Sequence, residues 1–129
     1  MTVAPPYTDR VLRLFSEAPG AGSVPPGPGE FIAAEAGQLA DEAWVRLEVR
    51  AEGGRVLAAA FRAWGCPHVI AAAALAAGRL PGLDSTGMAA LDAHILATDL
   101  GAPAAKLGRL LRVEDCVRAL AARVAATGR

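Results

Sequence analysis

Two alternating apolar and polar runs on either side of Gly53-Gly54 constrain the fold of this chain more than any other feature. In the first run, 44–50, apolar side chains stand at every second position, and in the second run, 55–64, the same spacing returns. A period of two is typical of strands with one buried face. Gly-Gly between two such runs is typical of a tight hairpin turn. The sequence therefore predicts an antiparallel hairpin near the middle of the chain.

The period changes from two to 3.6 after Gly65-Cys66, which predicts that a helix follows the hairpin directly. Pro67 suits the first helical position, and Gly78 is the expected C-terminal cap after Ala77. Four further elements are predicted: a helix within 5–17 capped by Thr8 or Asp9, a short strand at 31–36, a helix at 86–97 capped by Asp84 or Ser85, and a helix at 107–126.

This order of elements predicts an α+β fold, in which helices pack on one face of a small antiparallel sheet. The 129 residues are the length of one domain, so we expect a single domain over 1–129 with a flexible N-terminus at 1–6. Residues 19–30 hold four prolines and four glycines, which predicts a surface loop.

Charge and composition exclude several classes of protein. The 13 basic and 13 acidic residues cancel, which argues against binding to nucleic acid through phosphate contacts. No run of about 18 uncharged apolar residues is present, so we expect no membrane span. Residues 1–10 lack the pattern of a signal peptide, and two cysteines are too few for a disulfide framework. We therefore expect a cytoplasmic protein with reduced thiols, and the alanine- and arginine-rich composition is typical of a GC-rich bacterial genome.

Cys66 is the residue that most clearly carries potential chemistry. It stands where a predicted strand ends and a predicted helix begins, so its thiol faces the free N–H groups and the positive end of the helix dipole. Both favour the thiolate and hence a reactive cysteine. The alternative is a small buried thiol that fills a strand–helix corner.

The other candidate ligands are less informative. Cys116 lies in the middle of the last predicted helix among apolar residues, which predicts an inert, packed thiol. His68 forms a Cys-x-His pair with Cys66, which is half of a structural zinc site. His94 lies beside Ile95 and is expected at the surface or the edge of the core. The common nucleotide-binding and hydrolase motifs are absent from the sequence.

The central segments resemble the IscU/NifU-type iron–sulfur cluster scaffolds, in which a strand hairpin delivers a cysteine in a Gly-Cys turn before a helix rich in small residues. The resemblance covers roughly 7–126 and is carried by Trp44–Val49, Gly53–Val56, Phe61–Pro67 and Ile70–Leu75. It implies an IscU/NifU/SufE-like fold, a role in iron–sulfur cluster assembly and, as partners, a cysteine desulfurase or other assembly proteins. It implies an iron–sulfur cluster or metal ion bound by Cys66, and the Cys-x-His spacing adds His68 as a candidate metal ligand.

The sequence departs from this family at two of its three ligand cysteines. Ala36-Gly37-Gln38 stands at the Cys-Gly-Asp motif, and Gly108-Arg109 stands at the His-Cys pair of the last helix. Relative to the family, Asp41 and Glu42 lie in an insertion after Gln38. Two interpretations are open for them: they supply oxygen ligands, or they belong to a solvated loop. One cysteine cannot hold a two-iron cluster, which needs four ligands. The departures therefore leave open a chain that binds neither cluster nor metal.

Three functional hypotheses follow from the resemblance and the departures. The first is a scaffold-like protein of cluster assembly that does not hold a standard cluster. The second is a SufE-like acceptor of persulfide sulfur on Cys66, in which Arg109 lies near the thiolate and lowers its pKa. The third is a non-catalytic interaction or regulatory module. A scaffold or sulfur-transfer protein is favoured over a turnover enzyme. The alternative for Arg109 itself is a solvated arginine on the helix surface.

Overall fold

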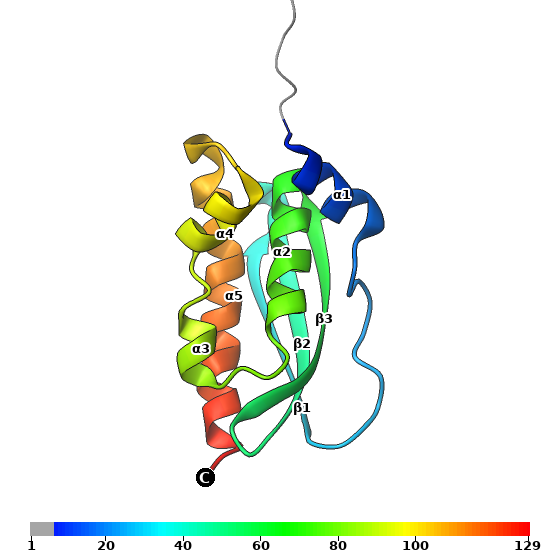
Figure 1. Ribbon diagram of the computed structural model, residues 1–129, viewed down its shortest axis with the longest axis vertical. Coiled ribbons are helices and arrows are strands. Elements are labelled where there is room, and N and C mark those ends of the chain that lie inside the picture. The colour runs from blue at the N-terminus through cyan, green and yellow to red at the C-terminus, as the bar shows by residue number, and fades with distance from the viewer. Residues whose placement is uncertain (1–6) are drawn as a thin grey trace, which may run out of the picture.

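The computed structural model describes residues 7–129, so the predicted flexible N-terminus at 1–6 lies outside the described residues. Within them the chain forms a three-stranded antiparallel sheet in the order β1-β2-β3, with helices against it (Figure 1). The α+β prediction is confirmed. In chain order the elements are α1 (Asp9–Glu17), β1 (Glu30–Gln38), η1 (Leu39–Asp41), β2 (Ala43–Glu52), β3 (Arg55–Gly65), α2 (Pro67–Arg79), α3 (Ser85–Ala89), α4 (Ala93–Leu100), η2 (Ala104–Lys106) and α5 (Leu107–Ala126).

The predicted hairpin is β2 and β3, joined by Gly53-Gly54, both with positive φ. The alternation found in the sequence separates the two faces of β2. Val45, Leu47 and Val49 are fully buried beneath the helices. The intervening side chains of Trp44, Arg46 and Arg50 are only partly buried.

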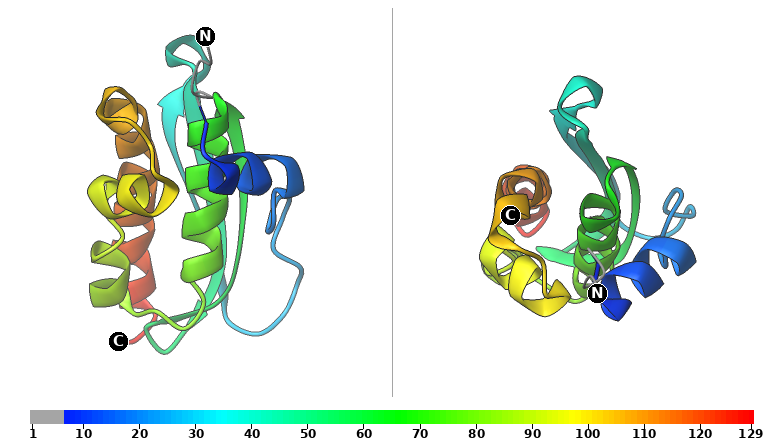
Figure 2. Two further views of the ribbon diagram at one scale, coloured as in Figure 1. Left: turned by 45° about the horizontal axis from the view of Figure 1, so that its top comes forward. Right: turned by 90° about the horizontal axis from the view of Figure 1, so that it is seen from above.

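α2 and α5 form the layer that covers the inner face of the sheet, and α1 packs on α2 (Figure 2). Six alanines of α2 are buried, and these small side chains let the helix lie close to its neighbours. On α5 every predicted inward-facing residue is fully buried: Leu110, Val113, Val117, Leu120 and Val124. On α1, Thr8 is the N-cap through its bond from the Val11 N–H, and Val11 is fully buried.

Two predictions about helices are wrong. α2 does not end at Gly78, because the helix continues to Arg79 and Leu80 donates to the Ala76 carbonyl. The predicted helix at 86–97 is two short helices, α3 and α4. Asp84 caps α3 and Asp92 caps α4 by accepting from the Ile95 N–H at 2.9 Å. The chain turns between them because a second N-cap competes with continued helix.

The Pro/Gly-rich segment 19–30 is a surface loop, as predicted, up to the start of β1 at Glu30. It begins along β3, where Phe61 exchanges backbone hydrogen bonds with Gly20 and Gly22. It then crosses the outer face of the sheet, where the Val24 N–H donates to the Glu48 carboxylate at 3.2 Å. Arg50 donates to the Pro25 and Pro28 carbonyls. Of residues 7–129, no helix combines the length and apolar character that a bilayer crossing requires.

Candidate functional site

The strand register brings distant parts of the chain to one end of the sheet. Gln38 pairs with Ala43, and Ala43 pairs with Gly65, so the end of β1, the connection before β2 and the end of β3 lie in one row. Cys66 follows Gly65 directly. α2 and α5 both begin at this end, opposite the C-terminus (Figure 1). The site is therefore assembled from three separate segments: the end of β1 with the connection to β2, the end of β3 with the start of α2, and the start of α5.

Cys66 is the N-cap residue of α2, as its position in the sequence predicts. Its backbone is extended, with φ −72° and ψ 165°, and Pro67 occupies the first turn. The Cys66 carbonyl accepts from the N–H groups of Val69 and Ile70 and so starts the helix. The thiol is half-buried and makes no N-cap hydrogen bond of ordinary geometry. It nevertheless faces the N–H groups of His68 and Val69 in the first turn.

The surroundings of Cys66 lower its pKa. Burial acts to raise the pKa, but it is outweighed by the Val69 N–H, the Arg109 guanidinium, the His68 N–H and the charge of Lys106, which together stabilise the thiolate. Arg109 therefore acts on the Cys66 thiolate while its own side chain stays 35% exposed. The same contact with Cys66 raises the pKa of Arg109, so the guanidinium stays charged.

Glu42, which the sequence offered as an oxygen ligand or as part of a solvated loop, lies at the site as the partner of Arg109. Its carboxylate lies 3.4 Å from the Arg109 guanidinium, with Glu42 66% and Arg109 35% exposed. Glu42 ends the η1 turn in the left-handed region, with φ 56°. It belongs to the segment directly before β2, and only the register of β2 against β3 places that segment beside Cys66.

Glu42, Trp64, Gly65 and Cys66 line a hollow of about 250 Å³. Trp64 is 49% exposed at its rim. The glycine at position 65 has a positive φ and presents only backbone beside Glu42, which keeps the approach to the thiol open. A small group or the tip of another chain therefore has access to Cys66.

His68 is buried, although it follows Cys66 closely in the sequence. Its side chain is 1% exposed and packs on the Tyr7 ring at 4.9 Å between centroids. Neither ring nitrogen has a hydrogen-bond partner among the described residues. Burial, followed by the charges of Lys106 and Arg109, lowers the His68 pKa, so the imidazole is neutral at pH 7. His68 does not line the hollow at Cys66.

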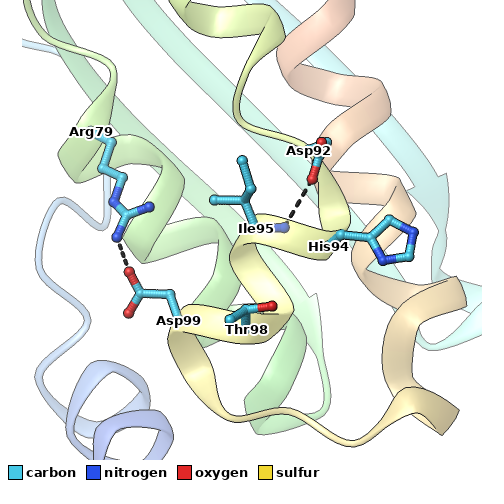
Figure 3. Close-up of a pocket in the computed structure, with 6 residues that line it drawn as sticks. All are labelled: Arg79, Asp92, His94, Ile95, Thr98 and Asp99. Carbon is cyan, nitrogen blue, oxygen red and sulfur yellow. Dashed lines mark hydrogen bonds and ion pairs between the residues drawn. The ribbon is translucent and has the colours of Figure 1, made fainter.

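The remaining sequence candidates lie away from Cys66. Cys116 is fully buried, its thiol donates to the Ala34 carbonyl at 3.2 Å, and burial raises its pKa to about 12. His94 is exposed and borders a separate hollow of about 440 Å³ along α4, where it points away from the Arg79–Asp99 ion pair (Figure 3). This second hollow shares no lining residue with the first.

The side chains present do not fit an iron–sulfur cluster. Residues 36–38 lie at the same end of the sheet as Cys66, and neither they nor Arg109 carries a thiol. Among residues 7–129, no three His, Cys, Asp or Glu side chains are grouped as a metal site requires. A cluster needs four ligands, usually thiolates, and Cys66 supplies one.

Comparison with known proteins places this arrangement in a family. The family model of the NifU-like N-terminal domain matches residues 6–125. Among solved structures, the chain is similar to a candidate iron–sulfur cluster assembly scaffold protein for the SUF system from thermophilic Fervidobacterium islandicum AW-1. That match has a TM-score of 0.57 and 15% identity and covers 95% of this chain and 88% of the other.

A second similar structure is a nitrogen-fixing NifU-like protein (N-terminal) from Brucella abortus. Its TM-score is 0.55, its identity is 18%, and the match covers 93% of this chain and 83% of that one. A comparison with curated proteins gives no match. At these identities the two structures show a shared fold, which agrees with the strand hairpin, the Gly-Cys turn and the order of helices. Because the family model spans nearly all of the chain, the protein belongs to the NifU-like family of iron–sulfur cluster assembly scaffolds.

Proposed function

We propose that this protein serves iron–sulfur cluster assembly by accepting sulfur on Cys66, without holding a standard cluster itself. The observation that carries the proposal is the placement of Arg109 and the first turn of α2 around a half-buried thiol whose pKa is lowered. Arg109 stands where the family carries a cysteine, so a cation that stabilises a thiolate replaces a thiolate that binds iron. This exchange favours sulfur transfer over cluster binding.

The transfer needs no oxidant or reductant. The Cys66 thiolate attacks the terminal sulfur of a persulfide carried by the donor cysteine. A new S–S bond forms at Cys66, the S–S bond of the donor breaks, and its electron pair stays on the donor sulfur as a thiolate. The donor's terminal sulfur, with its proton, becomes the terminal sulfur on Cys66. Atoms and electrons balance, because one persulfide replaces another.

The side chains of the site suit both ends of this reaction. Before transfer, the N–H groups of His68 and Val69 and the charges of Arg109 and Lys106 favour the nucleophilic thiolate. After transfer, the terminal sulfur lies one bond further from the helix, and the open hollow of about 250 Å³ has room for it. The donor that the family suggests is a cysteine desulfurase, which carries persulfide on its own cysteine.

Intact-mass spectrometry tests the proposal. After incubation with a cysteine desulfurase and L-cysteine, we expect the mass of the protein to rise by one sulfur atom and to return after reduction with dithiothreitol. Cys66→Ser should abolish the gain. Cys116→Ser is the matched control and should retain it, because the Cys116 thiol is fully buried.

A wild-type protein that stays unmodified beside an active desulfurase would contradict sulfur acceptance. If that protein still bound the desulfurase in a pull-down, the non-catalytic interaction module would be the better description. Equal loss of sulfur uptake in both cysteine variants would contradict the assignment of Cys66 as the acceptor.

A further inference from the structure

The Glu42–Arg109 ion pair lies beside the thiol that the proposed function uses. Glu42 lines the same hollow as Cys66, and its carboxylate is 3.4 Å from the Arg109 guanidinium. Arg109 also stabilises the Cys66 thiolate. The Arg109 guanidinium therefore interacts with two acidic groups from different segments, the Glu42 carboxylate and the Cys66 thiolate. Its several N–H donors, arranged in a fixed fork, make this arrangement chemically reasonable.

The backbone of Glu42 is fixed relative to Cys66. Its N–H donates to the Leu39 carbonyl at 3.0 Å, its carbonyl lies against Gly65, and the next residue, Ala43, is buried within the sheet. Arg109, in contrast, stands in the first turn of α5 on a long side chain with several free torsions. Such a side chain loses considerable entropy when it is held in one position. A partner with a fixed backbone is a means of holding it there.

We propose that Glu42 is a positioning residue that holds the Arg109 guanidinium against Cys66. The inference rests on the proposed function, since it assigns Glu42 a part in activating the sulfur acceptor. Glu42 does not touch the sulfur donor in this assignment. It acts through Arg109, and its removal is expected to leave the guanidinium free to turn into solvent.

Two cations act on the charge of Cys66, and the side chains of His68 and Tyr7 lie near these cations. Arg109 and Lys106 are positive and favour the thiolate, whereas the buried His68 is neutral and Tyr7 packs against it. Loss of the Glu42 charge has two opposite effects. It removes a negative group near the thiolate, which favours ionisation, and it releases Arg109, which opposes ionisation. The single variant Glu42→Gln mixes the two effects, so a double-mutant cycle is needed to separate them.

The cycle compares the wild type, Glu42→Gln, Arg109→Gln and the double variant. The readout is the rate at which iodoacetamide alkylates Cys66, measured by peptide mass spectrometry from about pH 5 to pH 10 around the free-thiol pKa of about 8.5. In the presence of Arg109, we expect Glu42→Gln to slow alkylation near neutral pH. In the Arg109→Gln protein, Glu42→Gln should leave the alkylation rate unchanged or raise it, because only the loss of a negative charge then acts on the thiolate. The expected coupling is about two- to five-fold in rate, the range of an exposed ion pair.

Asp41→Asn is the matched control. It removes the same charge from the neighbouring residue of the same connection, and its effect on alkylation should not depend on Arg109. Both members of the ion pair are partly exposed, so the variants should fold, and far-UV circular dichroism checks this. Effects of Glu42→Gln and Arg109→Gln that simply add would overturn the positioning role. If the effects of the two substitutions are coupled but the protein takes up no sulfur in the mass measurement, the positioning role of Glu42 stands and the proposed function is contradicted.

Discussion

The backbone carbonyl of Glu42 lies so close to Gly65 that a Cβ at position 65 would stand 2.5 Å from its oxygen. Gly65 also has a φ of 150°, a value that residues with side chains rarely adopt. This contact joins the connection before β2 to the residue that precedes the thiol. The geometry of the hollow at Cys66 therefore depends on the absence of a side chain at position 65.

Gly65→Ala is expected to lower the free energy of unfolding by about 1–3 kcal/mol, because the alanine is strained at this φ and overlaps the Glu42 carbonyl. Urea unfolding followed by circular dichroism measures the loss. Gly78→Ala is the control, because Gly78 lies inside α2 with open space around an added Cβ. It should stabilise the protein by about 0.5–1 kcal/mol. Equal stability of Gly65→Ala and the wild type would contradict the close approach.

Arg109→Ala is expected to raise the Cys66 pKa, because it removes a guanidinium that stabilises the thiolate. Alkylation of Cys66 at neutral pH should then slow, since the thiolate is the reactive form. As pH rises, the difference should shrink, because Cys66 ionises in both proteins. Rates of iodoacetamide labelling as a function of pH provide the measurement. A rate at neutral pH that is unchanged by Arg109→Ala would remove Arg109 from the site.

Cys116→Ala is expected to cost about 1 kcal/mol of stability, the order for loss of a small buried group. Sulfur uptake on Cys66 should be unaffected. The Cys116 pKa of about 12 also predicts negligible alkylation of the native protein at neutral pH. Thermal unfolding and peptide mass spectrometry give the two measurements. Rapid labelling of Cys116 in the folded protein would show that the core opens there.

Anaerobic reconstitution with iron and sulfide is expected to yield no stable cluster, because residues 7–129 hold no group of three His, Cys, Asp or Glu side chains suited to a metal. Visible absorption spectroscopy and iron analysis after desalting measure the outcome. A charge-transfer spectrum with stoichiometric iron would contradict this prediction if both were lost in Cys66→Ala. It would also mean that other side chains had been recruited as ligands.

Glu48 should make stability depend on pH. Its carboxylate is 3% exposed and accepts from the Val24 N–H and from Arg46 at 2.9 Å. Burial acts to raise its pKa, but the hydrogen bonds from Arg46 and Val24 and the charges of Arg46 and Arg62 hold the pKa below its ordinary value. The stability that Glu48 contributes is therefore complete above its unfolded pKa of about 4.3 and is lost as pH falls through the lower folded pKa.

Glu48→Gln tests this dependence. We expect it to lower the free energy of unfolding by about 1–3 kcal/mol at pH 7, the range for hydrogen bonds to a charged group. The difference in free energy of unfolding between Glu48→Gln and the wild type should become smaller at acidic pH, once the wild-type carboxyl is protonated. Urea unfolding at neutral and acidic pH provides the comparison. Glu35→Gln is the control, because Glu35 is 53% exposed and should change stability by less than about 0.5 kcal/mol. A difference in free energy of unfolding between Glu48→Gln and the wild type that does not change with pH would contradict the lowered pKa of Glu48.

Local pattern was enough to predict the elements whose structure follows from neighbouring residues. The alternation around Gly53-Gly54 predicted β2 and β3, and the apolar spacing of 107–126 predicted α5 with its inward face. The break between α3 and α4, inside the single helix predicted at 86–97, does not follow from the apolar spacing. There the Ala93 N–H donates to the Glu114 carboxylate of α5 at 2.9 Å, so a distant residue helps to begin α4.

The candidate site was predictable to a similar extent. The strand-to-helix position of Cys66 indicated a thiol at a helix N-terminus, and the structure places it there. The proximity of Arg109 to Cys66 followed only from the family resemblance. The ion pair between Glu42 and Arg109 joins residues 67 positions apart. No local pattern encodes such a pair, because it arises from the register of β2 and the start of α5.

The Pro/Gly-rich loop also covers part of one edge of the sheet. The outer edge of β3 offers free backbone groups to which a strand of another molecule can add. At Phe61 these groups are already bonded to Gly20 and Gly22, and at Val56 they are bonded to Gly82 and Leu83. At Phe61 the loop forms one isolated parallel bridge through Ala21, and it then leaves the edge and crosses the outer face of the sheet. A segment without regular structure thus covers part of an edge to which a strand of another molecule could otherwise add.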